Sequence, residues 1–161
     1  MSDDLVRLDR LRAQSGDSDN PDAATLRDIV RGVRRIAVVG ASRDPTKAAR
    51  RVPSYLAAKG FEVIPVNPHA ERIWGRPVKR SLDEVHEPVD LVLVFRPTGE
   101  AAGVARQALA RPERPVVWLQ EGIFAPEVAA EARAAGVAFV QNLCIYKAHR
   151  SLGENAPGLR R

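Results

Sequence analysis

Five short apolar segments recur along the chain and alternate with longer segments of mixed character. They occupy residues 36–40, 61–66, 89–95, 115–120 and 137–141. Their β-branched composition and nearly continuous hydrophobicity are typical of strands that are covered on both faces of a sheet. The pattern therefore predicts five buried strands.

Segments with helical character follow the first four of these strands. They occupy residues 46–59, 81–85, 99–110 and 125–135. In residues 99–110 the apolar side chains repeat at three- and four-residue intervals, which gives the helix one apolar face. Gly60 and Gly136 each stand between a helix and the next strand, where a residue that tolerates positive φ can end a helix. A further helix, capped by Asp22 or Thr25, is expected to end near Gly32, before the first strand.

Strands joined by helical crossovers run parallel, and right-handed crossovers place helices on both faces of the sheet. We therefore expect a single α/β domain over residues 21–152, with a doubly wound, Rossmann-like, five-stranded parallel sheet. Residues 1–20 are expected to form a mobile arm with one short helical stretch, and residues 153–161 a flexible basic tail. Ligands of such sheets bind outside the carboxyl ends of the strands.

Composition narrows the function classes. The chain of 161 residues is 45% hydrophobic and 28% charged, as in an ordinary globular domain, and its net charge of +5 favours an anionic partner. Cys144 is the only cysteine, which excludes an internal disulfide and a cysteine-rich zinc site, and the three scattered histidines do not suggest a metal enzyme. No apolar run is long enough to span a bilayer, and the charged N-terminus does not resemble a secretory signal. We expect a cytoplasmic protein.

The loop after the first strand reads GASRDPTKAARR, over residues 40–51. Gly40 permits a tight turn, and a helix that begins near Thr46 directs its free N–H groups toward the same space. Ser42 can add a hydroxyl donor, while Arg43 and Lys47 can add positive charge. The composition of this loop predicts a phosphate site. A small residue at position 40 is, however, also needed wherever a helix packs closely on a sheet.

Two nucleotide motifs are absent. The dinucleotide fingerprint GxGxxG lacks its second and third glycines, because Ser42 and Pro45 occupy those positions, and the second strand ends in Val66 and Asn67 instead of an acidic residue. The GxxxxGK[ST] loop is also missing. NAD binding and ATP hydrolysis are therefore not supported.

Five motifs together resemble the stand-alone CoA-binding proteins, which are single-domain relatives of the N-terminal domain of the succinyl-CoA ligase α-subunit. The motifs are GASRD at 40–44, VIPVNP at 63–68, PVDLVLVFRP at 88–97, WLQEGI at 118–123 and NLCIYKAH at 142–149. Their order and spacing extend the resemblance over about residues 30–152. The resemblance implies that coenzyme A or an acyl-CoA binds along the carboxyl edge of the sheet.

The same resemblance implies the residues of the CoA site. They are Gly40, Ala41, Ser42, Arg43, Lys47, Asn67, Pro68, Phe95, Arg96, Pro97, Gln120 and Glu121. A lysine that contacts CoA in the ligase domain is missing from the stretch NPHAER, so His69, Arg72 or Lys47 would have to supply its charge. Arg50 and Arg51 can neutralise phosphate or form a solvated helix face.

For the remaining cysteine, lysine, histidine and tryptophan residues of interest, the sequence leaves a functional and a structural role open. Cys144 follows the last strand and can lie near a bound thiol, although a buried apolar cysteine is the commoner case. Lys147 and His149 can reach a ligand or serve the surface. Trp74 and Trp118 are expected to be packing residues.

No catalytic residue and no metal ligand are assigned. The phosphohistidine of the ligase belongs to a second domain that has no counterpart here, so we expect non-catalytic binding of CoA or acyl-CoA. The alternatives are a CoA-dependent enzyme subunit acting with a partner chain and a nucleotide-responsive or nucleic-acid-binding regulatory module. The latter is disfavoured because aromatic residues, which stack on bases, make up only 5% of the chain. Whether the chain has a protein partner or forms an oligomer is not determined.

Overall fold

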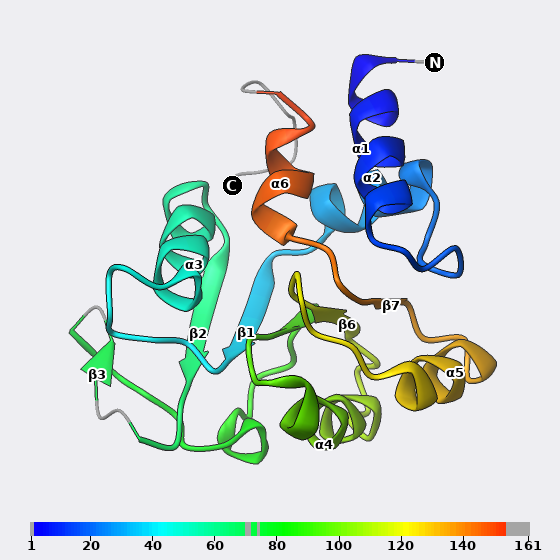
Figure 1. Cartoon of the computed structure of the whole chain (residues 1–161). Helices are drawn as coiled ribbons and strands as arrows, with labels where there is room; N and C mark the ends of the chain where they lie inside the picture. The colour runs from blue at the N-terminus through cyan, green and yellow to red at the C-terminus, as the bar shows by residue number, and fades with distance from the viewer. Residues whose placement is uncertain (1, 70–71, 74, 154–161) are drawn as a thin grey trace.

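A five-stranded parallel sheet forms the centre of the molecule (Figure 1). The computed structural model describes residues 2–69, 72–73 and 75–153. The strands are β1 (Arg35–Val39), β2 (Glu62–Val66), β5 (Leu91–Val94), β6 (Val116–Leu119) and β7 (Phe139–Val140), in the order β2-β1-β5-β6-β7. Every pairing in this sheet is parallel, so the predicted fold class is confirmed.

Alternation along the strands divides the core into two layers. Ile36 and Val38 of β1 pack into one hydrophobic cluster, and Ala37 and Val39 pack into the other. Because both faces of the strand are apolar, each face needs its own helical cover. One face is covered by α2 (Ala23–Gly32), α3 (Ala48–Ala58) and α6 (Ile145–Arg150), and the other by the 3₁₀ helix η1 (Leu82–Glu84), α4 (Thr98–Leu109) and α5 (Pro126–Ala134) (Figure 1).

The predicted helix ends are confirmed. Gly60 has φ 102°, its N–H donates to the carbonyl of Ala57, and the next N–H, of Phe61, donates to Leu56. Gly136 closes α5 with the equivalent pair of bonds. In this motif the glycine adopts positive φ so that the last carbonyls of the helix gain donors. At the start of α2 the cap is Asp22, whose carboxylate accepts from the N–H of Thr25 over 2.9 Å.

The connection from β2 to β5 differs from the predicted helix over residues 81–85. Only Leu82–Glu84 are helical, as a single 3₁₀ turn. This short crossover also contains a small antiparallel hairpin, β3 (Arg72–Ile73) and β4 (Arg76–Pro77), which the hydrophobic pattern did not predict. Five residues between Arg80 and His86 leave too little room for more than one turn of α-helix.

The N-terminal segment packs against the domain, in place of the mobile arm expected for residues 1–20, and it contains the expected helical stretch. Asp3–Gln14 form α1, whose Leu8 is fully buried against α2. Asn20 is buried as well, and its side chain exchanges two hydrogen bonds with the backbone of Gln141, at 2.9 and 3.0 Å. Leu8 and Asn20 therefore tie this segment to the domain, although its composition is polar. The tail expected from residue 153 lies outside the described residues, apart from Gly153.

The helices are short. The longest, α1 and α4, have 12 residues each. Within the described ranges, no helix is long and apolar enough to cross a membrane.

Candidate functional site

Gly40 makes the turn at the carboxyl end of β1, where the strand order reverses between β1 and β5. Its φ is 95°, and its N–H donates to the carbonyl of Val66 over 2.8 Å. A Cβ at this position would lie 3.2 Å from the backbone carbon of Phe95 and 3.1 Å from Cδ of Arg96. Glycine is needed because the turn combines positive φ with close approach to the neighbouring strand. This is the edge at which doubly wound sheets bind ligands.

Hydrogen bonds within the chain shape the loop after Gly40. The N–H of Ser42 donates to the carbonyl of Ala49, and the Ser42 hydroxyl accepts from the N–H of Asp44 over 3.0 Å. The Asp44 carboxylate in turn accepts from the N–H and hydroxyl of Thr46, at 2.9 and 2.7 Å. These bonds with Thr46 lower the pKa of Asp44. Helix α3 consequently begins at Ala48, two residues later than predicted.

Asp44 changes the charge of the predicted phosphate loop. Arg43 and Lys47 are both exposed, and the ionised Asp44 between them offsets one of their two charges. Asp44 is not among the predicted site residues, although an aspartate two positions before Thr46 is a common signal for a side-chain-capped turn. The Ala48 N–H, in the first turn of α3, has no intrahelical acceptor and makes no hydrogen bond with a described residue.

Asn67 joins the loops that follow β1 and β2. Its Nδ2 donates to the carbonyl of Ala41 over 2.7 Å, and its Oδ1 accepts from the N–H of His69 over 2.7 Å. Both ends of the amide are therefore occupied. Asn67 therefore positions the Ala41 loop, and it also lines the polar cavity described below.

Arg50 and Arg51 brace the same loop from α3. Arg50 donates from Nη1 to the carbonyl of Arg43 over 3.2 Å, and Arg51 donates from Nη1 to the carbonyl of Thr46. Neither arginine is merely a solvated helix-face residue. Arg51 also reaches the large cavity described below.

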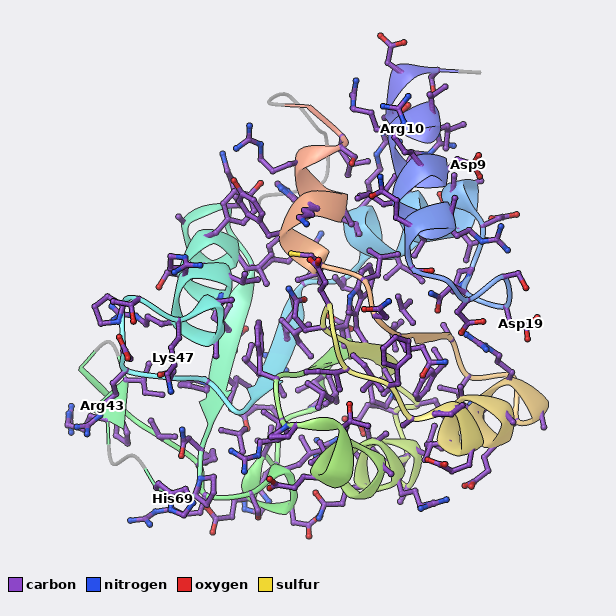
Figure 2. The ribbon with its side chains drawn as sticks, viewed as in Figure 1. Asp9, Arg10, Asp19, Arg43, Lys47 and His69 are labelled. Carbon is purple, nitrogen blue, oxygen red and sulfur yellow. The ribbon has the colours of Figure 1, made fainter. Side chains whose placement is uncertain are left out.

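Two cavities flank residues 42–48. The first, of about 600 Å³, is polar and is lined by Ser42, Arg43, Asp44, Pro45, Asn67 and His69. Figure 2 shows Arg43, Lys47 and His69 on the same side of the molecule. The second, of about 790 Å³, is lined by Ala48, Arg51, Val52, Phe95, Gln120, Glu121, Ile123, Cys144, Tyr146 and Lys147. Six of the predicted site residues thus line cavities: Ser42, Arg43 and Asn67 the first, and Phe95, Gln120 and Glu121 the second.

The large cavity contains three of the predicted residues. Phe95 contributes its ring at the end of β5, and Gln120, which is 5% exposed, accepts from the N–H of Ile145 over 3.2 Å. Glu121 forms an exposed ion pair of 3.1 Å with Lys147, and this contact raises the pKa of Lys147. The pair links the loop after β6 to α6, so two residues that are 26 positions apart border one cavity.

The remaining predicted residues do not line either cavity. Gly40 and Ala41 shape the turn, Lys47 precedes α3, and Arg96 forms an ion pair with Glu100. Pro97 caps α4, and the carbonyl of Pro68 accepts from Arg80. Arg72 donates to the carbonyl of Gly75 within the β3–β4 hairpin.

The structure also places the residues with weaker expectations. Cys144 is 8% exposed and still borders the large cavity, so it is both buried and next to the candidate site. His149 is 3% exposed and accepts from or donates to the Tyr55 hydroxyl through Nδ1, which is incompatible with the predicted ligand or surface role. Trp118 is fully buried and donates to the carbonyl of Leu143 over 2.7 Å, as expected for a packing residue. Trp74 lies outside the described residues.

Sequence reasoning did not select several residues of the large cavity. Val52, Ile123 and Tyr146 supply much of its apolar lining. Tyr146 lies within the NLCIYKAH motif, two residues after Cys144, and its position in the first turn of α6 was the available signal. Val52 and Ile123 carry no local signal, since any apolar residue of a helix or loop has the same pattern.

Comparisons with known proteins agree on one family. Residues 34–150 match the family model described as a CoA binding domain. The chain is 35% identical to the Bacillus subtilis protein YneT over 130 residues, which is 81% of this chain and 96% of YneT. A Thermus thermophilus structure is 38% identical, with a TM-score of 0.73, and covers 80% of this chain and 97% of its own.

A hypothetical protein from Pyrococcus horikoshii gives a similar result, with 31% identity, a TM-score of 0.75, and coverage of 86% of this chain and 95% of its own. The family match covers all five strands of the sheet and helices on both of its faces. The family match includes Gly40, the loop that follows it and the large cavity from Ala48 to Lys147. The chain therefore belongs to the CoA-binding domain family.

Proposed function

We propose that the protein binds coenzyme A or an acyl-CoA at the carboxyl edge of the sheet and does not transform it. The adenosine and phosphate end occupies the 600 Å³ cavity, and the pantetheine arm passes the start of α3 into the 790 Å³ cavity. The observation that carries this proposal is the pair of cavities on either side of residues 42–48, at the point where the strand order reverses.

The chemistry of the two cavities matches the two ends of the ligand. CoA has a highly anionic diphosphate head and an uncharged pantetheine arm. Arg43 and His69 border the polar cavity, whereas Val52, Phe95 and Ile123 make the second cavity more apolar. Ala48, whose N–H makes no hydrogen bond with a described residue, lines the larger cavity at the positive end of the α3 dipole, which favours a phosphate there.

The contacts of the polar side chains favour binding without catalysis. Ser42, Gln120 and Glu121 each use their side chains to hold a loop or helix in place. A serine or cysteine nucleophile requires an adjacent base. Among the described residues, neither Ser42 nor Cys144 hydrogen-bonds to a basic side chain.

Calorimetric titration tests the proposal directly. We expect CoA and acetyl-CoA to bind at least tenfold more tightly than NAD or ATP, because only CoA fills both cavities. Prolonged incubation with acetyl-CoA should release no free thiol in a thiol-reagent assay. Equal affinity for all the nucleotides would reduce the site to a general phosphate pocket, and thiol release with turnover would instead support a CoA-dependent enzyme.

A further inference from the structure

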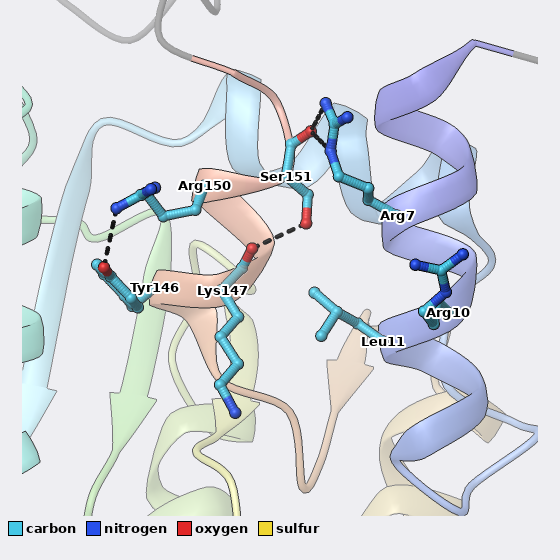
Figure 3. Close-up of a pocket in the computed structure, with 7 residues that line it drawn as sticks. All are labelled: Arg7, Arg10, Leu11, Tyr146, Lys147, Arg150 and Ser151. Carbon is cyan, nitrogen blue, oxygen red and sulfur yellow. Dashed lines mark hydrogen bonds between the residues drawn. The ribbon is translucent and has the colours of Figure 1, made fainter.

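A third cavity, of about 410 Å³, lies between α1 and α6 and is strongly basic (Figure 3). Four of the residues that line it are cations, namely Arg7, Arg10, Lys147 and Arg150. None of its described lining residues is acidic. Glu121, outside the wall, pairs with Lys147 over 3.1 Å, which leaves the three arginines without an acidic neighbour in the wall. A concave surface with such an excess of positive charge attracts anions.

Internal hydrogen bonds hold two of these guanidinium groups in place. Arg7 donates from Nε and Nη2 to the carbonyl of Ser151, at 2.9 and 2.6 Å, and Arg150 donates from Nη1 to the Tyr146 hydroxyl over 3.0 Å. A guanidinium has five donors, so each retains free N–H groups. Arg10 makes no side-chain hydrogen bond or ion pair with any described residue. The cavity therefore has two arginines held in place, Arg7 and Arg150, and a third, Arg10, whose side chain has no partner among the described residues.

The acidic residues of α1, which are Asp3, Asp4 and Asp9, do not line this cavity. Asp4 lies near Arg27 and Arg31 of α2, at 3.8 and 3.6 Å, and is not among the lining residues of the cavity. The cations also come from the two ends of the chain, and the Arg7–Ser151 bonds bring these ends together. An ordinary solvated helix face would not require such a contact between distant segments.

The basic cavity adjoins the 790 Å³ cavity. Tyr146 and Lys147 line both cavities. A molecule whose reactive end lies beside Cys144 can therefore extend a charged group past Lys147 toward Arg10. Arginine binds carboxylate and phosphate oxygens through paired N–H donors, so both groups suit this wall.

We propose that the α1–α6 cavity is a binding site for a carboxylate or phosphate group. The group belongs either to a free anion or to the acyl chain of a thioester held in the neighbouring cavity. The second source rests on the proposed function, whereas the first does not.

The experiment uses the full chain, the Arg10→Gln variant and a matched control, Arg34→Gln. Arg34 is exposed beside the amino end of β1, and its side chain has no hydrogen bond or ion pair with a described residue. Inorganic phosphate is titrated at low ionic strength while the backbone amide shifts of residues 146–151 are followed by NMR. Acetyl-CoA and glutaryl-CoA, whose acyl chains differ in a terminal carboxylate, are compared by calorimetry.

If the anion is free, phosphate should shift the amides of residues 146–151 to saturation, and Arg10→Gln should weaken this binding by roughly fivefold while Arg34→Gln does not. If the anion is carried by the thioester, glutaryl-CoA should bind roughly fivefold more tightly than acetyl-CoA, and Arg10→Gln should remove that preference.

The proposal is overturned if phosphate leaves these amides unmoved and the two thioesters bind equally. It is also overturned if Arg10→Gln and Arg34→Gln have the same effect. Acetyl-CoA binding reports on the proposed function separately. If no CoA species binds but phosphate still shifts residues 146–151, the CoA proposal fails and the anion site stands.

Discussion

The Nδ2 atom of Asn67 donates a 2.7 Å hydrogen bond to the backbone carbonyl of Ala41 and so joins the carboxyl ends of β2 and β1. The same side chain accepts from the N–H of His69. One amide thus sets the distance between the phosphate loop and the neighbouring turn. Precise placement matters here because a ligand that bridges two loops binds most tightly when the loops are already in position.

Replacement of this amide should weaken both the fold and the site. For Asn67→Ala we expect a loss of about 1.5 kcal/mol in the free energy of unfolding, from one part-buried and one exposed hydrogen bond, and roughly tenfold weaker CoA binding. Urea denaturation and calorimetry measure the two effects. Asn67→Asp keeps the acceptor for His69 but loses the donor to Ala41, so it should also weaken CoA binding. Unchanged affinity in both variants would remove Asn67 from the site.

Gly40 should tolerate no side chain. In Gly40→Ala the Cβ meets atoms of Phe95 and Arg96 at 3.1–3.2 Å, in addition to the strain of φ 95°. We expect a loss of about 3 kcal/mol in urea unfolding. Gly16→Ala is the matched control, because Gly16 has φ 74° and no atom within 4 Å of the added Cβ. It should lose only about 1 kcal/mol, and equal losses in the two variants would show that the close approach to β5 is unimportant.

Arg43 should contribute electrostatically to recognition of the CoA head. For Arg43→Ala we expect roughly fivefold weaker CoA binding and a smaller dependence of affinity on salt. Pantetheine, which lacks the phosphates, should bind both forms equally. Arg34→Ala removes the same charge from the opposite end of the sheet and should leave CoA affinity unchanged. If the two arginine variants behave alike, only the net charge of the protein is involved.

His149 should make stability depend on pH. Burial, with a smaller contribution from the Lys59 charge, lowers the pKa of His149 to about 4, whereas the histidine of the unfolded chain titrates at its ordinary value near 6.5. The unfolded state therefore takes up the proton first, and stability falls as the pH decreases from about 6.5 to about 4. The loss should total about 3 kcal/mol.

Urea denaturation at several pH values measures this loss. The variant His149→Gln keeps a hydrogen-bonding group opposite Tyr55 but does not titrate. Its stability should be nearly independent of pH between about 5 and 6.5. Below pH 5 the carboxylates with lowered pKa values, such as Asp17 and Glu113, add their own losses in both proteins. A wild-type slope equal to that of the variant above pH 5 would contradict the assignment.

Local sequence signals were sufficient for most of the framework. The alternation of apolar strands and helices predicted the parallel sheet, and Gly60 and Gly136 marked helix ends that the structure confirms. These features depend on residues within a few positions of one another, such as a glycine and the last carbonyls of its helix. Residues 81–85 were predicted less well, because five residues fit one 3₁₀ turn and one α-helical turn almost equally.

The candidate site divides in the same way. The loop after Gly40, the ends of β5 and β6, and the family resemblance were readable from the sequence. The hydrogen bond of Asn67 to Ala41 and the ion pair of Glu121 with Lys147 were not, because each contact joins segments whose separation in space depends on the whole sheet. A list of motif residues therefore could not distinguish those that line a cavity from those that hold a loop.

The amino-acid sequence by itself determined the order of the five sheet strands along the chain, the edge of the sheet that carries the loops, and the family. Only the tertiary structure decided that two cavities flank residues 42–48, that His149 is buried, and that α1 packs against α6 to enclose a basic cavity. The physical reason is the range of the interactions involved. Periodicity and turn chemistry act between near neighbours, whereas a contact such as Arg7 with Ser151 joins residues 144 positions apart and leaves no pattern in either segment.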